Sequence, residues 1–310
     1  MLMSRRVSVL VVCVVVAFAG HLSHVAAQTA QPAPSEDPAK GAALIAEARK
    51  AVGGEDTLTA VKRLQIKGDM KRGQGNVTLE GDSEIFLEPP DKFRRNESLS
   101  IGLGGPGIER VEILNGNDVI DENTGGGRGG FGRGGDFGGN RGGGDFGGGN
   151  GGGFRGRRDG GGGDGNGANS DGAQRGRGQI DPERLKEAQR RNRQAEVARL
   201  LVATLLSTSS PVAWIGTAQS PEGNADVIEI KIDGNPTRLF LDTSTHLPLM
   251  LTWNAGRNRT QEMHLSDYKA VGGIKLPHLV TRGANGETSE EWTIKSYKIN
   301  PNFKANTFTK

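Results

Sequence analysis

The stretch from Gly125 to Gly178 is more than half glycine and carries a few scattered aromatic residues, Phe131, Phe137, Phe146 and Phe154 among them. Glycine loses more backbone entropy on folding than any other residue, and this composition offers little apolar surface to bury in return. We therefore expect a disordered Gly/Arg-rich insertion over residues 125–180. Any core must be built from the residues on its two sides, 37–124 and 181–310.

Both ends of this insertion border ordered patterns. Asn123-Thr124 closes a strand-like segment, and Asp181-Pro182 has the preferences of a helix start. Because loop-closure entropy grows slowly with loop length, a long surface insertion is tolerated within one domain. We expect residues 37–124 and 181–310 to be two parts of one β domain. The insertion itself is expected to be a surface loop, with a tether or a low-affinity partner site as the alternative.

The first 27 residues have the three parts of a secretory signal. Arg5 and Arg6 form the charged part, Val7 to Gly20 the apolar part, and Val25-Ala26-Ala27 the cleavage site. The apolar run is shorter than the roughly 20 residues needed to span a bilayer. We expect export to the periplasm or beyond, cleavage after Ala27, a flexible linker over 28–36 and no permanent membrane span.

Removal of this signal changes the charge and the cysteine content. The formal net charge of +3 falls to about +1 without Arg5 and Arg6, and Cys13, the single cysteine, is lost. Nucleic-acid affinity comes mostly from neutralised phosphates, so a nearly neutral chain is not expected to bind nucleic acid, despite its Arg-Gly-Phe repeats. Disulfides and thiolate chemistry are excluded from the mature chain.

Hydrophobic periodicity predicts two helical segments before the strands. Asp37-Pro38 marks a helix start, Leu44, Ile45, Ala48 and Val52 share one face, and Gly53-Gly54 ends the helix. A short second helical turn is expected over Asp56 to Val61. From Leu64 onward the period changes to two, with turn signals such as Asn115-Gly116, and we expect about nine to eleven antiparallel strands over the mature chain.

The segment Asp181 to Leu206 predicts a long helix with two different halves. Its first half is basic and solvated, whereas Val197 to Leu206 is apolar nearly all round and must be buried. Two interpretations remain open: the apolar end packs on the sheet, or it lines an apolar cavity while Arg190, Arg191 and Arg193 meet anionic headgroups.

Several short motifs stand out in the two ordered parts of the sequence. They are Gly81-Asp82, Pro90-Asp91-Lys92-Phe93-Arg94, Leu114-Asn115-Gly116, Leu241-Asp242-x-x-Thr245-x-Leu247-Pro248, and Asn300-Pro301 with Phe308. They resemble the LolA/LolB-like outer membrane lipoprotein-sorting proteins. The resemblance covers roughly 43–122 and 200–310. It implies an α+β fold that is mainly β: a strongly curved antiparallel sheet, an open half-barrel, with helices across its concave face and an apolar cavity for acyl chains.

Catalytic patterns are weak in this sequence. Gly102 to Gly107 matches GxGxxG but precedes a strand-like segment, and a dinucleotide site needs a helix there. His246, His264 and His278 fall on or beside separate predicted strands, with no local pairing for a metal. The carboxylates Asp226, Glu229, Glu290 and Glu291 alternate as on a solvated sheet face. We expect no enzyme activity, no cofactor and no metal.

The leading hypothesis is a non-enzymatic exported protein that binds a lipid or an acylated protein in an apolar cavity. Large rings and pliable thioethers suit acyl chains. The alternative is a sensor or interaction module of the same fold, with a filled interior and other envelope proteins as partners. The expected cavity-lining residues are Leu201, Leu205, Trp214, Met250, Trp253, Met263 and Trp292.

Overall fold

The computed structural model describes residues 36–102, 107–124, 181–207, 211–220, 223–256 and 259–310, which belong to one compact unit, Glu36–Lys310. The expected signal, linker and glycine-rich insertion lie outside these residues, apart from Glu36. The helices are α1 (Pro38–Val52), α2 (Glu55–Thr59) and α3 (Pro182–Ala203). The strands are β1 (Leu64–Gln74), β2 (Val77–Glu88), β3 (Lys92–Ser100), β4 (Gly107–Asn115), β5 (Asp118–Thr124), β6 (Val212–Ser220), β7 (Gly223–Ile232), β8 (Asn235–Asp242), β9 (Pro248–Asn254), β10 (Thr260–Val271), β11 (Ile274–Ala284) and β12 (Glu287–Ile299).

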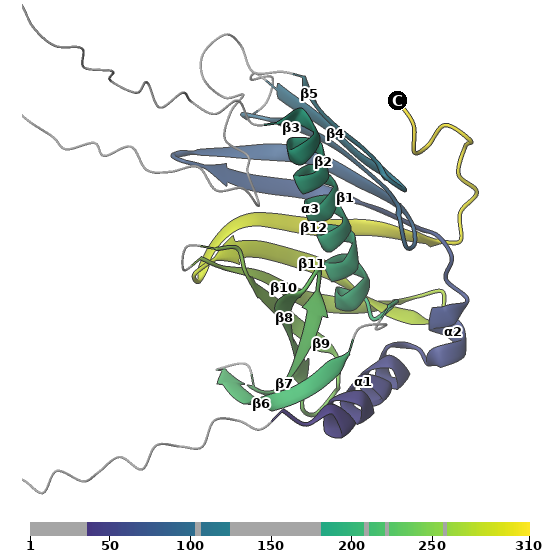
Figure 1. Cartoon of the computed structure of the whole chain (residues 1–310), viewed down its shortest axis with the longest axis vertical. Coiled ribbons are helices and arrows are strands. Elements are labelled where there is room, and N and C mark those ends of the chain that lie inside the picture. Colours follow the sequence, from purple (N-terminus) through teal and green to yellow (C-terminus); the bar gives the residue numbers. More distant parts are fainter. Residues whose placement is uncertain (1–35, 103–106, 125–180, 208–210, 221–222, 257–258) are drawn as a thin grey trace, which may run out of the picture. The chain divides into compact units, whose positions relative to one another are not determined.

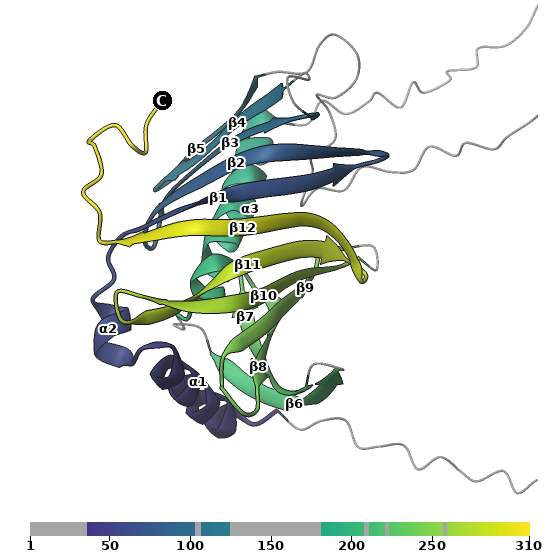
Figure 2. The same cartoon turned by 180° about the vertical axis from the view of Figure 1, so that it is seen from behind.

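These strands form one sheet in the order β5-β4-β3-β2-β1-β12-β11-β10-β9-β8-β7-β6 (Figures 1 and 2). Every neighbouring pair is antiparallel. Strands β5 and β6 stand at the two ends of this order, so the sheet is unclosed. The first strand, β1, pairs with the last, β12, so strands from both sides of residues 125–180 belong to one sheet. The sheet has twelve strands, more than the nine to eleven expected.

Tight turns set the register of the hairpins. Asp233 and Gly234, between β7 and β8, have φ of 49° and 73°, and Asn285 and Gly286, between β11 and β12, have φ of 53° and 83°. Two consecutive residues with positive φ are typical of type I′ turns, whose twist matches that of the flanking strands. Asx-Gly pairs adopt this conformation with little strain, so the sequence specifies both hairpins locally.

Helix α1 begins and ends as the sequence predicts. The Asp37 side chain accepts a hydrogen bond from the Lys40 backbone N–H, and the Gly53 N–H donates to the Arg49 carbonyl. The helix packs against β6 and β11. At its start the backbones of Asp37 and Trp214 exchange two hydrogen bonds of 2.9 Å, which anchors α1 to the edge strand β6.

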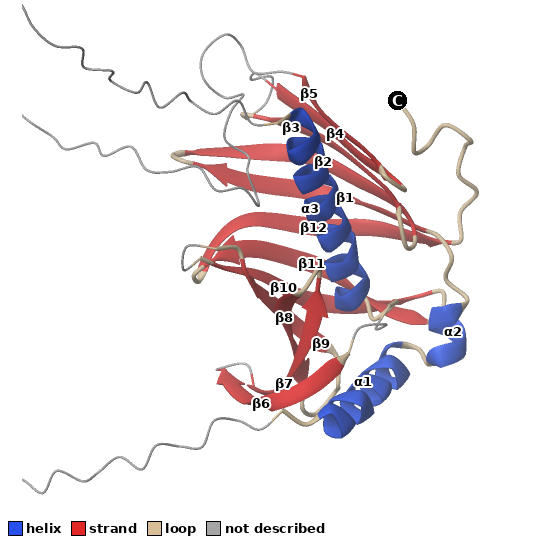
Figure 3. Cartoon of the chain, viewed as in Figure 1, coloured by secondary structure: helices blue, strands red, loops and turns tan. Residues whose placement is uncertain are grey.

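Helix α3 packs on one face of the sheet. It contacts β4 and β5 near one end of the strand order and β7 and β9 near the other, and Figure 3 shows it crossing in front of the sheet. Strands so far apart in the order meet the same helix only if the sheet curves towards it. We call the face that packs against α3 the inward face.

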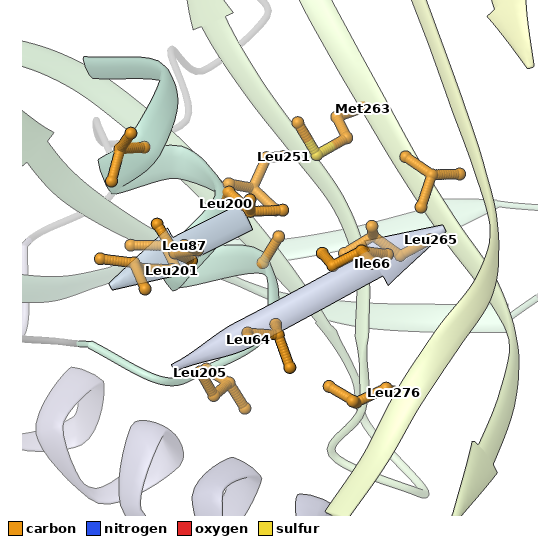
Figure 4. Packing of buried hydrophobic residues seen from close by; sticks show 14 of the residues in the cluster. Leu64, Ile66, Leu87, Leu200, Leu201, Leu205, Leu251, Met263, Leu265 and Leu276 are labelled. Carbon is orange, nitrogen blue, oxygen red and sulfur yellow. The ribbon is translucent and has the colours of Figure 1, made fainter. Parts of the chain in front are cut away.

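The two halves of α3 differ as expected. Leu185, in the first half, is 48% exposed, whereas the apolar end is buried, and the helix ends at Ala203 rather than at Leu206. The buried apolar residues of this end are Val197, Leu200, Leu201, Val202 and Ala203, with Leu205 just beyond the helix. They lie in one cluster with side chains of the sheet, including Leu64, Ile66, Leu87, Leu251, Met263, Leu265 and Leu276 (Figure 4).

Candidate binding site on the inward face of the sheet

The inward face carries charged residues as well as apolar ones. On β3 the buried residues are Phe93, Arg95, Glu97 and Leu99, which alternate with more exposed neighbours. Because successive side chains of a strand point to opposite faces, Arg95 and Glu97 share the buried face of Phe93 and Leu99. The guanidinium of Arg95 lies 5.5 Å from the Phe93 ring centroid. A buried charge is costly unless it is paired, so the partners of these groups determine what this face can do.

Strand register supplies the first partners. Arg95 stands opposite Glu112 of β4, and the two side chains are 3.1 Å apart. On the neighbouring strands Arg72 of β1 stands opposite Glu290 of β12, with Nε and Oε1 2.6 Å apart, and a second Arg72 nitrogen lies 3.0 Å from Glu97. The sheet alone therefore joins β1, β3, β4 and β12 through ion pairs.

Helix α3 adds further ion pairs to those within the sheet. Arg193 donates to Glu112 at 2.7 Å and to Asp121 of β5 at 2.9 Å. Glu196, one turn further, accepts from Arg193 and contacts Arg95 and Arg282. We call these ten residues the ion-pair cluster; it contains five arginines and five carboxylates. They are Arg72, Arg95, Arg110, Arg193, Arg282, Glu97, Glu112, Asp121, Glu196 and Glu290.

The electrostatics of this cluster keep its central groups charged. Burial by itself raises the pKa of Glu112, but the positive charges of Arg95, Arg193 and Arg110 outweigh it and lower this pKa to about 2. Burial lowers the pKa of Arg95 to about 10, even though Glu112 and Glu97 oppose this effect. Both groups therefore remain charged at neutral pH. The cluster fixes the first half of α3 to the sheet electrostatically, while the second half is fixed by apolar packing.

The second half has one polar anchor of its own. The buried guanidinium of Arg49, on α1, donates to the carbonyl of Leu205 and also pairs with Glu55 of α2. Leu205 has a φ of 55° and no exposed surface, so the chain turns sharply here inside the core. This contact fixes the end of α3 against α1.

The interior is closely packed beside the ion-pair cluster. One cavity there has a volume of about 10 Å³ and is lined by Met70, Ile85, Arg95, Val280, Arg282, Glu290 and Trp292. The buried Nε1 of Trp292 has no hydrogen-bond partner in the described part of the chain. A space of this size accommodates about one water molecule, which could accept the indole proton.

The structure brings together four of the seven residues expected to line an apolar cavity. Leu201, Leu205, Met263 and Trp292 are buried members of one core cluster. Trp214 and Trp253 are partly exposed and pack against this cluster. Met250 is also partly exposed, but it alternates with the buried Leu251 along β9 and therefore lies on the opposite face of the sheet. Trp214 lies in the contact with α1, where Lys40 Nζ is 3.4 Å from the ring centroid and Asp226 accepts from Nε1 at 2.9 Å. The four buried residues are packed within the core cluster.

The three arginines expected to meet headgroups occupy two environments. Arg190 and Arg191 lie at the surface and both pair with Glu187. Arg193 is 7% exposed and bound by the ion-pair cluster. Beside Arg191 an open groove of about 570 Å³ runs between the first half of α3 and the β7–β8 turn. It is lined by Glu183, Arg184, Glu187, Ala188, Arg191, Asn192 and Asp233.

Sequence reasoning missed most of the ion-pair cluster. Glu290 was expected on a solvated face, but it is 5% exposed and points to the inward face, where Arg72 holds it. The available signal was strand parity: Glu290 has the parity of Trp292, as Arg95 has that of Phe93. Charged residues in a strand usually lie on its solvent-exposed face. This general rule gave the wrong prediction for Glu290.

The three histidines each contact a different residue and do not form a common site in the described part of the chain. Within the described residues there is no group of three or more His, Cys, Asp or Glu side chains that could hold a metal ion. No helix in this part of the chain is long and apolar enough to cross a membrane. The imidazole of His246 lies 3.8 Å from Glu47, that of His264 lies 3.3 Å from Glu262, and that of His278 lies 3.0 Å from the Leu276 carbonyl.

Comparison with known proteins gives structural matches alone. No family model matches the chain, and no curated protein sequence matches it. A LolA superfamily protein from Nitrosomonas europaea is similar over 87% of this chain and 98% of its own, with a TM-score of 0.42 and 9% identity. A DUF1329 family protein from Desulfovibrio piger is similar over 88% and 98%, with a TM-score of 0.43 and 9% identity.

A third solved structure is a domain named for outer membrane lipoprotein sorting, from Vibrio parahaemolyticus. It is similar over 88% of this chain and 97% of its own, with a TM-score of 0.42 and 10% identity. The structures to which this chain is similar therefore include proteins of the superfamily that its sequence motifs resemble.

Proposed function

We propose that this protein is an exported, non-enzymatic binding protein whose ligand is a lipid or an acylated protein. The acyl chain would bind on the apolar part of the inward face, the concave side of the sheet, where the end of α3 now lies. One observation carries this proposal: a single element, α3, supplies Leu200 and Leu201, with Leu205 just beyond it, over the apolar side chains of the sheet (Figure 4).

An exchange of α3 for an acyl chain is energetically plausible. Exposing a buried leucine costs about 1.5–3 kcal/mol, and burying a methylene group returns about 0.8 kcal/mol. An acyl chain that buries roughly six to eleven methylene groups would thus offset three exposed leucines. Common membrane acyl chains are long enough for this. The ion-pair cluster would keep the first half of α3 on the sheet while its apolar end moves.

The non-enzymatic and exported character rests on separate observations. The charged groups of the ion-pair cluster neutralise one another, and in the described residues the histidines have separate partners. The signal pattern in residues 1–27 supports a periplasmic or secreted location.

Shortening the apolar end of α3 tests the proposal. Leu201→Ala removes a side chain that an acyl chain would have to displace, and Leu58→Ala removes another buried leucine, which belongs to α2 and not to α3. Both variants should lose about 2–5 kcal/mol of unfolding free energy. A fatty acid carrying a polarity-sensitive fluorophore should bind Leu201→Ala at least about fivefold more tightly than the wild type. Leu58→Ala should bind it as the wild type does, and equal affinity in all three proteins would refute the proposal.

A second candidate function is favoured by the close packing of the interior. With a cavity of about 10 Å³ beside the ion-pair cluster, the protein could be a sensor or interaction module that keeps its interior filled and binds other envelope proteins on its surface. In that case Leu201→Ala would lose stability without any gain in fatty-acid binding. The same titration therefore separates the two functions.

A further inference from the structure

A sixth arginine lies on the inward face outside the balanced ion-pair cluster. The guanidinium of Arg199, on α3, lies over the ring of Trp253 of β9, 4.5 Å from its centroid. Stacking on an aromatic ring holds a guanidinium in one plane and leaves its edge free for hydrogen bonds. Arg199 is therefore fixed in orientation at the boundary between the charged and apolar parts of this face.

Arg199 lacks the carboxylate partner that the five cluster arginines have. In the described residues no carboxylate oxygen lies within 4.0 Å of it, and its buried Nε has no hydrogen-bond partner. Burial and, to a smaller extent, the positive charge of Arg282 lower the pKa of Arg199 to about 10, whereas Asp233 opposes both effects. The positive charges of Arg199 and Arg282 therefore repel each other, and of the two only Arg282 has a carboxylate partner, Glu196.

A second polar group near Trp253 is also unsatisfied. Thr237 of β8 stands directly opposite Trp253 in the sheet and has no exposed surface. Its hydroxyl has no hydrogen-bond partner in the described part of the chain. A buried donor without a partner costs about 1–3 kcal/mol, more for a charged group. The surroundings of Trp253 therefore contain an excess of donors and positive charge.

We propose that Arg199, stacked on Trp253, forms a binding site for an oxyanion group, a phosphate or a carboxylate. Such a group would accept from Nε and one terminal nitrogen of Arg199, the two-pronged geometry that guanidinium groups provide. Its negative charge would neutralise the arginine that the ion-pair cluster leaves unpaired. This site does not rest on the proposed function, because it belongs to α3 in its position on the sheet; displacement of the apolar end by an acyl chain would move Arg199 away from Trp253.

Thermal unfolding in phosphate tests the site directly. The protein is melted in sodium phosphate and in sodium chloride at equal ionic strength and pH. The comparison uses Arg199→Met and the matched control Arg238→Met, an exposed arginine of β8. Phosphate at tenfold excess over its dissociation constant should raise the wild-type and Arg238→Met midpoints by about 3 °C beyond the increment seen in Arg199→Met. In chloride Arg199→Met should be at least as stable as the wild type, because an unpaired charge is removed.

The source of the oxyanion is distinguished by a second arm. Flotation with phosphatidylglycerol and with phosphatidylcholine vesicles measures headgroup binding of the same three proteins. If phosphate alone gives the Arg199-dependent shift, the site takes a free oxyanion. If only phosphatidylglycerol vesicles bind, and Arg199→Met lowers this binding at least tenfold, the site takes a headgroup. Equal responses of Arg199→Met, Arg238→Met and the wild type in both arms would overturn the site, whether or not fatty acids bind.

Discussion

Arg193 of α3 and Glu112 of β4 are joined by a hydrogen bond of 2.7 Å, with side chains only 8% and 1% exposed. Two opposite charges so far from solvent stabilise the fold only as long as both are present, because removing one leaves the other charges of the ion-pair cluster buried and no longer balanced. This pair links the helix to the sheet at the centre of the ion-pair cluster, and it determines how the protein should respond to mutation and to acid.

Removal of Arg193 should destabilise the protein strongly. Arg193→Ala leaves Glu112 and Asp121 without their shared partner, and we expect a loss of about 3–5 kcal/mol in the free energy of unfolding. Arg191→Ala, on the exposed side of the same helix, removes a surface pair with Glu187 and should cost less than about 1 kcal/mol. Urea unfolding of both variants checks this. Similar losses would show that the buried position of Arg193 has no special effect.

Because of Glu112, the free energy of unfolding should depend on pH in the acidic range. Its pKa in the folded protein is about 2, against 4.5 for an ordinary glutamate. A lowered folded-state pKa contributes stability above the unfolded value, and this contribution is lost as pH falls from about 4.5 towards about 2. At 1.36 kcal/mol per unit the contribution is roughly 3 kcal/mol.

The corresponding measurement is the unfolding free energy between pH 6 and pH 2 for the wild type and for Glu112→Gln. The variant should be less stable at neutral pH and should lose less stability over the acidic window. Parallel curves for the two proteins would be inconsistent with a strongly paired Glu112.

Gly81 of β2 should not tolerate a side chain. A Cβ at this position would overlap the backbone carbonyl of Ser98 on β3, so an alanine forces two backbones apart. We expect Gly81→Ala to lose more than about 2 kcal/mol of unfolding free energy. Gly73→Ala, on β1, serves as the control because its Cβ would have only an ordinary contact of 3.7 Å with the Ser289 carbonyl. Thermal melts that rank the two variants in the opposite order would argue against this strand packing.

The C-terminal segment should act as a stabilising strap on the face of the sheet opposite the inward one. Phe303 packs edge-to-face on Phe86 of β2 and on Phe308, with 5.6 Å between ring centroids in each pair. Arg94 donates to the carbonyls of Thr307 and Thr309. Phe308→Ala should therefore cost about 3 kcal/mol in denaturant unfolding. Lys310→Ala, which removes only an exposed pair with Glu122, should cost less than about 1 kcal/mol.

Local signals in the sequence were enough to locate many elements. Asp37-Pro38 and Gly53 mark the ends of α1, and Asp181-Pro182 marks the start of α3, because capping preferences depend on a few adjacent residues. The short helix α2 begins at Glu55 and ends at Thr59, one residue earlier at its start and two at its end than the pattern suggested. Fraying of short helices makes such differences ordinary.

The ion-pair cluster could not be predicted from the sequence, because its members come from several elements. The parity of β3 already shows that Arg95 and Glu97 share a face with Phe93, but a buried charge is plausible only when its partners are known. Those partners come from β1, β4 and α3, and the three elements meet only in the folded protein. Arg199 and Trp253, the basis of the oxyanion site, likewise meet only through tertiary packing.

The most direct test of the central claim, lipid binding on the inward face, is native mass spectrometry with solvent extraction. The protein would be purified from a bacterial periplasm in its wild-type form and as Leu201→Ala. We expect a phospholipid or acyl chain bound to the wild type. We expect a larger bound fraction in Leu201→Ala, because less of α3 must be displaced. Ligand-free masses for both proteins, with no extractable lipid, would contradict it and support the interaction module with a filled interior.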